Sequence, residues 1–321
     1  MERWARELAS RLPVLSPGRY ASAAPPAWAS GPAGQAWEQV ALPALARREG
    51  TPLILNPANL APLRFGGNVV VIHDAAAIRE PDWYSAPYAR WQRMALPRIA
   101  RRARAVITPS EFSRDEIVEL LGVSEAKVSV VPGGVDERFS PGAGAAAVAH
   151  ALGLDRPYVL TVASRTSRKN LASLGVAASA LREEGIELVA AGGERSGLRD
   201  GDLTGSVKTL GTISDALLPG LYAGARAFVL PSFHEGFGLT ALEAMKSGVP
   251  VVVSDAGALP EVCGDAATYV DPSDPAGIAT AVVAAAAREG VDTKAVEVAS
   301  RFTWERTAAG VDRVIGRLLA S

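Results

Sequence analysis

Two glutamates, Glu235 and Glu243, have the spacing and surroundings that best suit catalysis. They lie in the run His234–Met245, which follows a buried strand ending at Pro231 and leads into a helix that begins near Gly238. The first N–H groups of a helix lack internal partners and can bind an anion, and glycines let a ligand approach the backbone. The pattern predicts a diphosphate site, with Glu243 accepting hydrogen bonds from ribose and Glu235 nearer a sugar.

Both glutamates also have simpler interpretations. Glu235 could be an ordinary loop acid, and Glu243 could be a surface residue paired with Lys246. The position of the loop at the carboxyl end of a predicted parallel strand favours the ligand site, because α/β proteins bind ligands there.

A basic turn, Arg165–Asn170, follows another predicted strand, Tyr158–Ser164. Three cations at a strand end suit a phosphate-rich ligand, although a solvated basic turn is the alternative. In the first half of the chain, His73-Asp74 comes just after the predicted strand residues Val69–Ile72. We expect this histidine at a cleft between two domains, with a purely structural histidine as the alternative.

No metal is predicted at this site. Asp200-Gly201-Asp202 has the spacing of a metal-binding motif, but it follows a glycine-containing loop instead of a strand, so we interpret it as a polar turn. Arg165, Lys169 and the helix N-terminus already offer positive potential to a phosphate group.

The second half of the chain must position these residues, and its pattern is regular. Short β-branched runs alternate with helical stretches, which favours a parallel sheet covered on both faces. The predicted strands are Tyr158–Ser164, Ile186–Ala191, Val207–Gly211, Ala227–Pro231, Val249–Ser254 and Thr268–Val270. The predicted helices are Leu171–Glu184, Asp215–Gly224, Leu239–Ser247, Pro260–Gly264 and Pro275–Arg288.

The first half repeats this pattern less regularly. Predicted strands are Leu53–Leu55, Val69–His73, Ala105–Thr108 and Val128–Val131, and predicted helices are Gln35–Arg48, Ser85–Arg102 and Ser113–Leu121. Ser113 and Glu116 have capping-box spacing. A glycine- and proline-containing stretch, Pro132–Arg156, is interpreted as the interdomain linker.

The two ends of the chain complete the predicted organisation. Met1–Leu12 resembles a helix with no strand before it, and Phe302–Leu319 is an amphipathic helix expected to pack back on the first domain. The predicted domains are residues 1–138, completed by residues 302–321, and residues 155–301.

Composition narrows the class of protein. The chain has 321 residues, of which 48% are hydrophobic and 21% charged, so it suits two globular domains. A formal net charge of -1 provides no overall field for nucleic acid. The single cysteine, Cys263, excludes an internal disulfide framework, and no targeting segment or apolar span is visible, so a cytoplasmic location is expected.

One helix could bring the chain to a membrane. Six arginines lie between Arg90 and Arg104, interleaved with Trp91, Met94, Leu96 and Ile99. An amphipathic basic helix of this kind can rest on anionic lipid at the inner membrane face. The alternative is a solvated arginine face over a packed apolar face.

Taken together, the ordered motifs resemble the family 4 retaining glycosyltransferases, which have the GT-B fold. The most specific match is the E-x7-E motif from Glu235 to Glu243. The other matching segments are His73-Asp74, Pro109–Arg114, Val130–Asp136, Arg168–Asn170, Gly192-Gly193, Ser247–Val262 and Phe302–Ala308. The resemblance implies two Rossmann-like domains facing across a cleft, and transfer of a hexose-type sugar from a nucleotide-sugar donor.

The resemblance also implies roles for single residues. Lys169 and Arg165 would hold the donor diphosphate, Glu243 the ribose, and Glu235 the transferred sugar, while His73 would line the reaction centre. Further contacts to the donor would come from the backbone amides of Phe237, Gly238 and Leu239, and the segment at Thr212-Ile213 would border the base.

The chain departs from the family pattern at three places. The usual strand-end Gly-Arg pair is Ala163-Ser164, with Arg165 one position later, and Gly134 stands where asparagine is common. The opening strand and glycine-rich loop of the first domain are also missing before Met1. We expect this strand to be encoded upstream.

The implied reaction is transfer with retention of anomeric configuration, without a metal or other cofactor, to a glycan or a lipid-linked saccharide. The favoured route is front-face attack, with the leaving phosphate accepting the proton of the acceptor. Two alternatives remain open: a nucleotide-sugar-binding protein without transfer activity, and an enzyme of the same fold that is an epimerase or phosphorylase.

Overall fold

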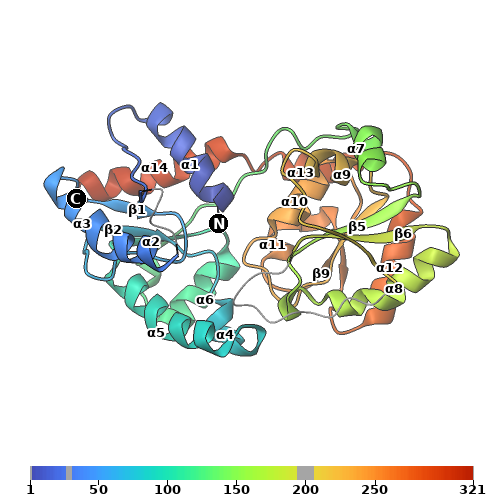
Figure 1. Ribbon diagram of the computed structural model, residues 1–321, viewed down its shortest axis with the longest axis horizontal. Coiled ribbons are helices and arrows are strands. Elements are labelled where there is room, and N and C mark those ends of the chain that lie inside the picture. Colours follow the sequence, from blue (N-terminus) through green and yellow to red (C-terminus); the bar gives the residue numbers. More distant parts are fainter. Residues whose placement is uncertain (1, 27–30, 194–205, 321) are drawn as a thin grey trace. The chain divides into compact units, whose positions relative to one another are not determined.

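The computed structural model describes residues 2–26, 31–193 and 206–320, apart from the side chains of Glu2 and Pro32, and it divides the chain into two compact units (Figure 1). The first unit takes in the chain up to Arg79, then Tyr88–Gly134 and the C-terminal segment from Trp304. The second unit contains Val135–Thr303 and also the short segment Glu80–Pro87. Each unit is built on one parallel sheet, which confirms the predicted α/β class.

The second unit contains a six-stranded sheet in the order β10-β9-β8-β5-β6-β7, and all its pairings are parallel. Chain order reverses between the neighbouring strands β5 and β8, and such a switch point is where open α/β sheets bind ligands. The strands are β5 Tyr158–Val162, β6 Glu187–Ala191, β7 Lys208–Gly211, β8 Ala227–Leu230, β9 Val251–Ser254 and β10 Thr268–Val270.

Helices cover both faces of this sheet, with α8 and α12 packed together on one face and α10 and α13 on the other (Figure 1). The helices are α7 Ala145–Ala151, α8 Leu174–Glu183, α9 Leu218–Ala223, α10 Leu239–Lys246, α11 Leu259–Cys263, α12 Pro275–Ala286 and α13 Thr293–Ala299. Single 3-10 turns occupy Pro81–Trp83, Ser167–Lys169, Leu171–Ser173 and Gly264–Ala266.

Three sequence predictions for this unit need correction. The predicted linker contains helix α7, and the sequence analysis missed α13, whose N-cap Asp292 accepts a hydrogen bond from the Ala295 amide at 3.1 Å. Helix α9 starts at Leu218, three residues after the predicted start at Asp215. Pro219 explains this start, because proline is favoured in the first turn of a helix.

The first unit contains a four-stranded parallel sheet in the order β1-β2-β3-β4. The strands are β1 Ile54–Asn56, β2 Asn68–Val71, β3 Ala105–Thr108 and β4 Val128–Val130. The helices are α1 Glu2–Leu15, α2 Pro32–Ala36, α3 Leu42–Arg48, α4 Ala76–Arg79, α5 Ala86–Arg102, α6 Glu111–Leu121 and α14 Trp304–Ala320, with a π-helical turn at Trp37–Ala41 and a 3-10 turn at Glu125–Lys127.

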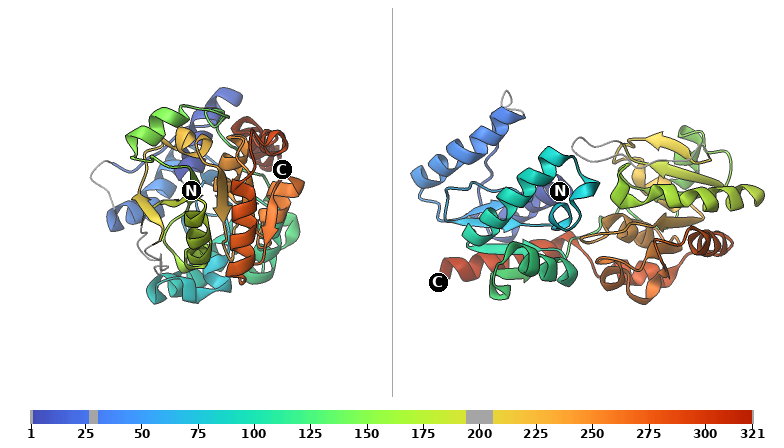
Figure 2. Two further views of the ribbon diagram at one scale, coloured as in Figure 1. Left: turned by 90° about the vertical axis from the view of Figure 1, so that its right-hand side faces the viewer. Right: turned by 90° about the horizontal axis from the view of Figure 1, so that it is seen from below.

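Alternating strand residues divide the core of this unit between two helical layers. Val69 and Val71 of β2 pack with α1 and α14, whereas Val70 faces the layer made by α5 and α6. Because successive strand side chains point to opposite faces, one apolar strand serves both layers. Figure 2 shows the same arrangement of helices and strands from two further directions.

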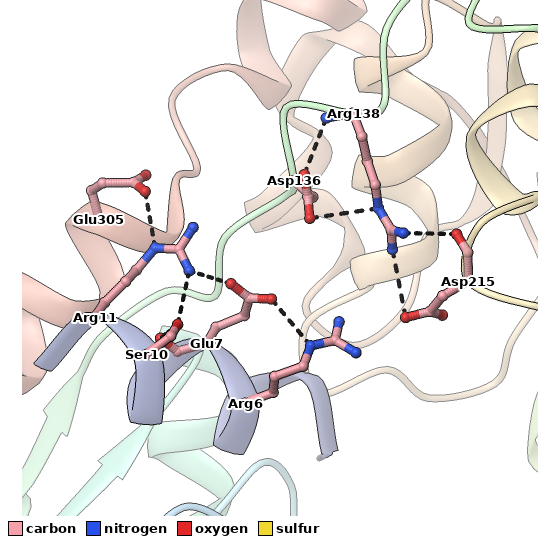
Figure 3. A network of polar contacts seen from close by, with 8 residues as sticks. All are labelled: Arg6, Glu7, Ser10, Arg11, Asp136, Arg138, Asp215 and Glu305. Atoms are coloured by element: carbon pink, nitrogen blue, oxygen red, sulfur yellow. Dashed lines mark hydrogen bonds and ion pairs between the residues drawn. The ribbon is translucent and has the colours of Figure 1, made fainter.

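The C-terminal helix packs back on the first unit, as predicted. Trp304 of α14 lies edge-on to Trp4 of α1, with ring centroids 5.9 Å apart. Polar contacts surround this apolar seam. Arg11 of α1 pairs with Glu7 and with Glu305, the latter at 2.9 Å (Figure 3), and the Tyr20 hydroxyl lies 2.6 Å from Asp312.

The predicted capping box at Ser113 and Glu116 is wrong. Helix α6 begins at Glu111, and its N-cap is Ser110, whose hydroxyl accepts a hydrogen bond from the Ser113 amide at 3.0 Å. Ser113 therefore lies in the first turn, and Glu116 pairs instead with Arg79. Two serines three residues apart before an apolar run offer two possible caps, and the helix uses the first of them.

Among the described helices, none is both long enough and apolar enough to cross a lipid bilayer.

Trp304→Ala tests the seam between α1 and α14. The Trp304 side chain is 1% exposed, so its removal should leave a cavity and lower the free energy of unfolding by about 3–5 kcal/mol. Trp91→Ala is the control, because Trp91 is 37% exposed and its loss should change stability by less than about 0.5 kcal/mol. Urea denaturation followed by circular dichroism measures the free energy of unfolding of both variants. Equal decreases in the two variants would contradict a specific contribution of the seam to stability.

Candidate functional site

The candidate site lies at the carboxyl ends of strands β5, β8 and β9. Strand β8 ends at Leu230, and the loop Pro231–Gly238 then leads into α10, which starts at Leu239 as predicted. The turn after β5 carries Arg168 and Lys169. These two loops bring residues far apart in the sequence into direct contact.

Glu235 is the centre of this contact. Its carboxylate is bonded by the Lys169 ammonium at 2.5 Å, by the Ser232 hydroxyl at 2.7 Å and by the Arg168 guanidinium at 3.3 Å. Arg168 also donates to the carbonyl oxygen of His234 at 2.6 Å. Glu235 is only 6% exposed, so the structure places a buried carboxylate between two cations at the carboxyl edge of the sheet.

The surrounding charges keep Glu235 ionised. Burial by itself would raise the pKa of its carboxyl, but the charges of Lys169 and Arg168 and the hydrogen bonds from Lys169 and Ser232 lower it to about 2. The Lys169 ammonium depends on Glu235 in turn, because Lys169 is only 9% exposed and a buried charge needs a charged partner. The three side chains together carry one net positive charge, which suits an anionic ligand.

A second loop holds the backbone of Glu235 in place. Gly257, in the turn after β9, has a φ of +63°, and a Cβ added there would lie 2.6 Å from the Glu235 carbonyl oxygen and 2.7 Å from its amide nitrogen. The Ala258 amide donates to the same carbonyl at 2.9 Å, and the Ser254 hydroxyl donates to the Ser232 carbonyl. The sequence analysis did not identify Gly257 and Ser232 as site residues. The available signal was a glycine in the short turn after a predicted strand.

Helix α10 carries the other predicted residues of this loop. Gly238 is its N-cap, with a φ of +94°, and a Cβ there would lie 2.7 Å from Leu259. Phe237 is 8% exposed and packs edge-on against Phe302, with ring centroids 5.8 Å apart. Phe237, Gly238 and Leu239 therefore sit at the start of α10, the position from which backbone amides can reach an anion.

Glu243 is buried in the second turn of α10. It is 2% exposed, and the Tyr222 hydroxyl donates to its carboxylate at 2.9 Å. Lys246, the partner in the alternative interpretation, donates instead to the Ser300 hydroxyl at 2.8 Å. Glu243 is thus held from inside the unit, and Lys246 donates to another residue.

A cavity of about 330 Å³ opens at the carboxyl ends of β5, β6 and β7. Its lining is Ala163, Arg165, Leu171, Ala190, Gly192, Gly193, Thr209, Gly211 and Thr212. A Cβ at Gly193 would lie 2.6 Å from the Thr212 hydroxyl, so this glycine lets the ends of β6 and β7 come close together. The volume is that of a small-ligand site.

The lining of the cavity differs from the sequence prediction for two residues, Arg165 and Ile213. Arg165 lines the cavity, whereas Lys169, four residues later, contacts Glu235. Thr212 also lines the cavity, but its neighbour Ile213 is not among the lining residues and is half-buried. The turn Arg165–Leu171 thus connects the cavity with the charged cluster.

Arg138 is a further residue that the sequence analysis missed. Its guanidinium donates to the carbonyl oxygen of Asp215 at 2.7 Å and lies 3.5 Å from the Asp136 carboxylate (Figure 3). Asp215 follows Thr212 in the loop after β7, so Arg138 holds the loop that borders the cavity.

His73 belongs to the first unit and follows β2 as predicted. Its Nε2 lies 3.2 Å from the Pro57 carbonyl oxygen, and its ring is edge-on to Trp4 at 5.4 Å. Burial is the main cause that lowers the pKa of His73 to about 4, so the ring is neutral at physiological pH. Because a carbonyl only accepts, Nε2 carries the proton and Nδ1 remains an acceptor.

Asp200-Gly201-Asp202 lies outside the described residues. In the ranges that are described, no group of three or more histidine, cysteine, aspartate or glutamate side chains is arranged to hold a metal ion. The expectation of a metal-independent site stays a prediction.

Both halves of the chain match known protein families. Residues 16–139 match the family model described as Glycosyltransferase Family 4, and residues 156–288 match the one described as Glycosyl transferases group 1. O-antigen chain mannosyltransferase B of Escherichia coli is 31% identical over 263 residues, which cover 76% of this chain and 68% of the relative. D-inositol 3-phosphate glycosyltransferase of Actinosynnema mirum is 30% identical over 331 residues, covering 94% and 73%.

Solved structures share the fold. Sucrose-phosphate synthase from Thermosynechococcus elongatus superimposes with a TM-score of 0.68 at 24% identity, covering 87% of this chain and 77% of its own.

Gly257→Ala should disturb Glu235 without touching any charged group. A residue with a Cβ at this positive φ is strained, and the Cβ would also displace the Glu235 backbone. We expect roughly 100-fold slower release of nucleoside diphosphate from a nucleotide sugar, since small misplacements at a reaction centre are costly.

Gly185→Ala is the matched control for this substitution. Gly185 has a φ of +71° but no atom within 4 Å of an added Cβ, so it shares the strain and lacks the contact. Both variants should lose similar amounts of thermal stability, measured by melting. If both also lose similar amounts of activity, the contact between Gly257 and Glu235 has no functional role.

Proposed function

Because the chain belongs to the family 4, or group 1, glycosyltransferases, and is therefore an enzyme with the GT-B fold, we propose that it transfers a hexose from a nucleotide-sugar donor to a glycan or glycolipid-like acceptor. The observation that carries this proposal is the buried, ionised Glu235 held between Lys169 and Arg168 beside a strand-end cavity.

In this proposal the donor occupies three parts of the arrangement. The diphosphate would lie between the Lys169–Arg168 turn and the start of α10, where cations and helix amides provide positive potential. The nucleoside would extend toward the cavity lined by Arg165 and Thr212, with Glu243 accepting hydrogen bonds from ribose. The transferred sugar would then lie at Glu235.

We propose that transfer occurs on one face of the sugar, with retention of configuration. The bond between the anomeric carbon and the β-phosphate oxygen breaks, and its electron pair stays on that oxygen. The acceptor oxygen forms the new bond to the anomeric carbon from the same face, and its proton passes to the leaving phosphate oxygen. The sugar gains oxocarbenium character during this step, which the negative charge of Glu235 stabilises.

Fixed cations and amides would stabilise the leaving phosphate, so no metal ion is required in this proposal. As binding begins, Lys169 would turn part of its interaction from Glu235 to the phosphate, which frees a Glu235 oxygen for the sugar. Without donor, the ion pair would therefore satisfy the charges that later contact the phosphate and the sugar.

A donor screen tests the proposed function. The chain is melted with UDP-, GDP- and ADP-linked hexoses, and each ligand that raises the melting temperature is assayed for nucleoside diphosphate release, with and without EDTA. We expect one nucleotide class to stabilise the chain and to be turned over in EDTA. Stabilisation without any turnover would indicate a binding protein, and activity lost in EDTA but restored by Mn²⁺ would contradict metal independence.

Substitutions of the two glutamates should affect different kinetic constants. Glu235→Gln removes a charge that acts mainly as the sugar gains positive character, so kcat should fall roughly 100-fold, equivalent to about 2.7 kcal/mol. Glu243→Gln weakens ribose binding equally before and during reaction, so it should mainly raise the donor KM. Steady-state kinetics of donor turnover measure both.

Two further variants control this comparison. Glu187→Gln removes a half-buried carboxylate that pairs with Lys208 at the start of β6, at the edge of the sheet opposite the site. This substitution should leave both constants unchanged. Tyr222→Phe removes the hydrogen bond to Glu243 and should raise the donor KM less than Glu243→Gln does. Wild-type kinetics in both glutamate variants would contradict the proposed site.

We also propose that α5 contacts anionic lipid. The helix contains no acidic residue and exposes Arg90, Arg93 and Arg98 together with Trp91 and Met94, which are 37% and 54% exposed. Exposed cations beside exposed apolar side chains suit the interface of an anionic membrane. A lipid-linked acceptor would be presented at such a surface.

Vesicle flotation tests this contact. The wild-type chain should float with vesicles containing phosphatidylglycerol and not with pure phosphatidylcholine. Arg90→Gln/Arg93→Gln/Arg98→Gln should weaken binding roughly 100-fold, at about 1 kcal/mol for each charge. The control Arg182→Gln/Arg226→Gln/Arg288→Gln removes three exposed arginines of the second unit. An equal loss in both triple variants would show that only net charge matters.

A further inference from the structure

An exposed and a half-buried aromatic side chain lie against each other next to the Glu235 cluster. Trp83 and Phe233 lie nearly parallel, with an interplanar angle of 13° and ring centroids 6.4 Å apart; we call this pair the aromatic shelf. Trp83 ends the 3-10 turn Pro81–Trp83, which groups with the second unit. Phe233 is 39% exposed, although a large aromatic side chain is normally buried.

The shelf is anchored to the charged cluster through the backbone. The Phe233 amide donates to the Arg168 carbonyl oxygen at 3.0 Å, and the Arg168 guanidinium contacts Glu235. Only His234 separates Phe233 from Glu235, and the buried His234 ring lies against Trp83 at 6.2 Å. A ligand on the shelf therefore lies next to the residue that we assign to the transferred sugar.

Exposure distinguishes the shelf from the donor site. Glu235 and Lys169 are 6% and 9% exposed, so the groups assigned to the donor face inward. Phe233, in the same loop as Glu235, exposes its ring to solvent. A second substrate, the acceptor, would approach from solvent. In the described residues, the other aromatic side chains of the two segments, Tyr84 and Phe237, are buried, so the shelf is only two rings wide.

A sugar ring fits these properties better than a lipid chain. The faces of aromatic rings carry negative potential, and the C–H groups on one face of a pyranose carry partial positive charge. Exposed Glu80 and Asp82 flank Trp83, and they can accept hydrogen bonds from sugar hydroxyls. Two rings with acidic neighbours are too small and too polar to cover an acyl chain.

We propose that the aromatic shelf of Trp83 and Phe233 binds a sugar ring of the acceptor, and so orients an acceptor hydroxyl toward the anomeric carbon. This inference rests on the proposed function, and it identifies the acceptor as a saccharide at the point of transfer. Phe233 then contributes to acceptor recognition without contacting the donor.

Saturation-transfer NMR on the full chain tests the shelf directly. The probe is octyl β-D-glucopyranoside below its micelle concentration, because it carries a sugar ring and an alkyl chain in one molecule, and methyl glycosides of glucose, mannose and galactose are measured in parallel. Samples contain UDP or GDP. We expect transfer to the ring protons of at least one glycoside, and a weaker effect on the alkyl protons.

Variants assign the binding to the shelf. Phe233→Ala and Trp83→Ala should each raise the Kd of the bound glycoside about tenfold, equivalent to about 1.4 kcal/mol. Phe233→Tyr keeps the ring and should bind like the wild type, and Val176→Ala, which removes an exposed apolar side chain on α8, should have no effect.

Three outcomes would overturn the inference: no glycoside bound by the wild type, an unchanged Kd in Phe233→Ala, or saturation confined to the alkyl chain. Donor turnover is measured on the same samples. A wild type that binds glycosides at the shelf but releases no nucleoside diphosphate from any nucleotide sugar would contradict the proposed function and leave the shelf supported.

Discussion

The ion pair between Glu235 and Lys169, with Arg168 beside it, is the interaction on which the site depends. A carboxylate and an ammonium buried together are stable only when each remains paired, because an isolated buried charge is strongly disfavoured. Both residues are under 10% exposed, so neither loop can move away alone. The turn after β5 and the loop after β8 are therefore held together before any ligand binds.

This charged cluster could not hold its geometry without small residues around it. Gly257 lets the loop after β9 lie directly against the Glu235 backbone, and Gly238 lets α10 start beside Leu259. Both glycines have positive φ, where a side chain is strained as well as obstructed. The same edge of the sheet thus combines a charge pair that needs fixed partners with backbone positions that strongly favour glycine.

The first unit is stabilised by contacts from both ends of the chain. Trp4 near the N-terminus meets Trp304 near the C-terminus, and ion pairs and hydrogen bonds from Arg11 and Tyr20 to α14 surround the apolar contact. These residues cover one face of the four-stranded sheet, where His73 also contacts Trp4. The orientation of His73 therefore depends on helix α1, which itself depends on α14.

The sequence by itself determined the parallel α/β class, the strand positions and the loop that carries Glu235, because buried parallel strands are continuous apolar runs and their ends are marked by glycine and polar residues. It did not determine the partners of those residues. Only the tertiary structure decided that Lys169 contacts Glu235 while Arg165 lines the cavity, and that Trp83 lies against Phe233. The physical reason is that periodicity and local propensity act within one element, whereas a side-chain partner is fixed by packing between elements distant in sequence.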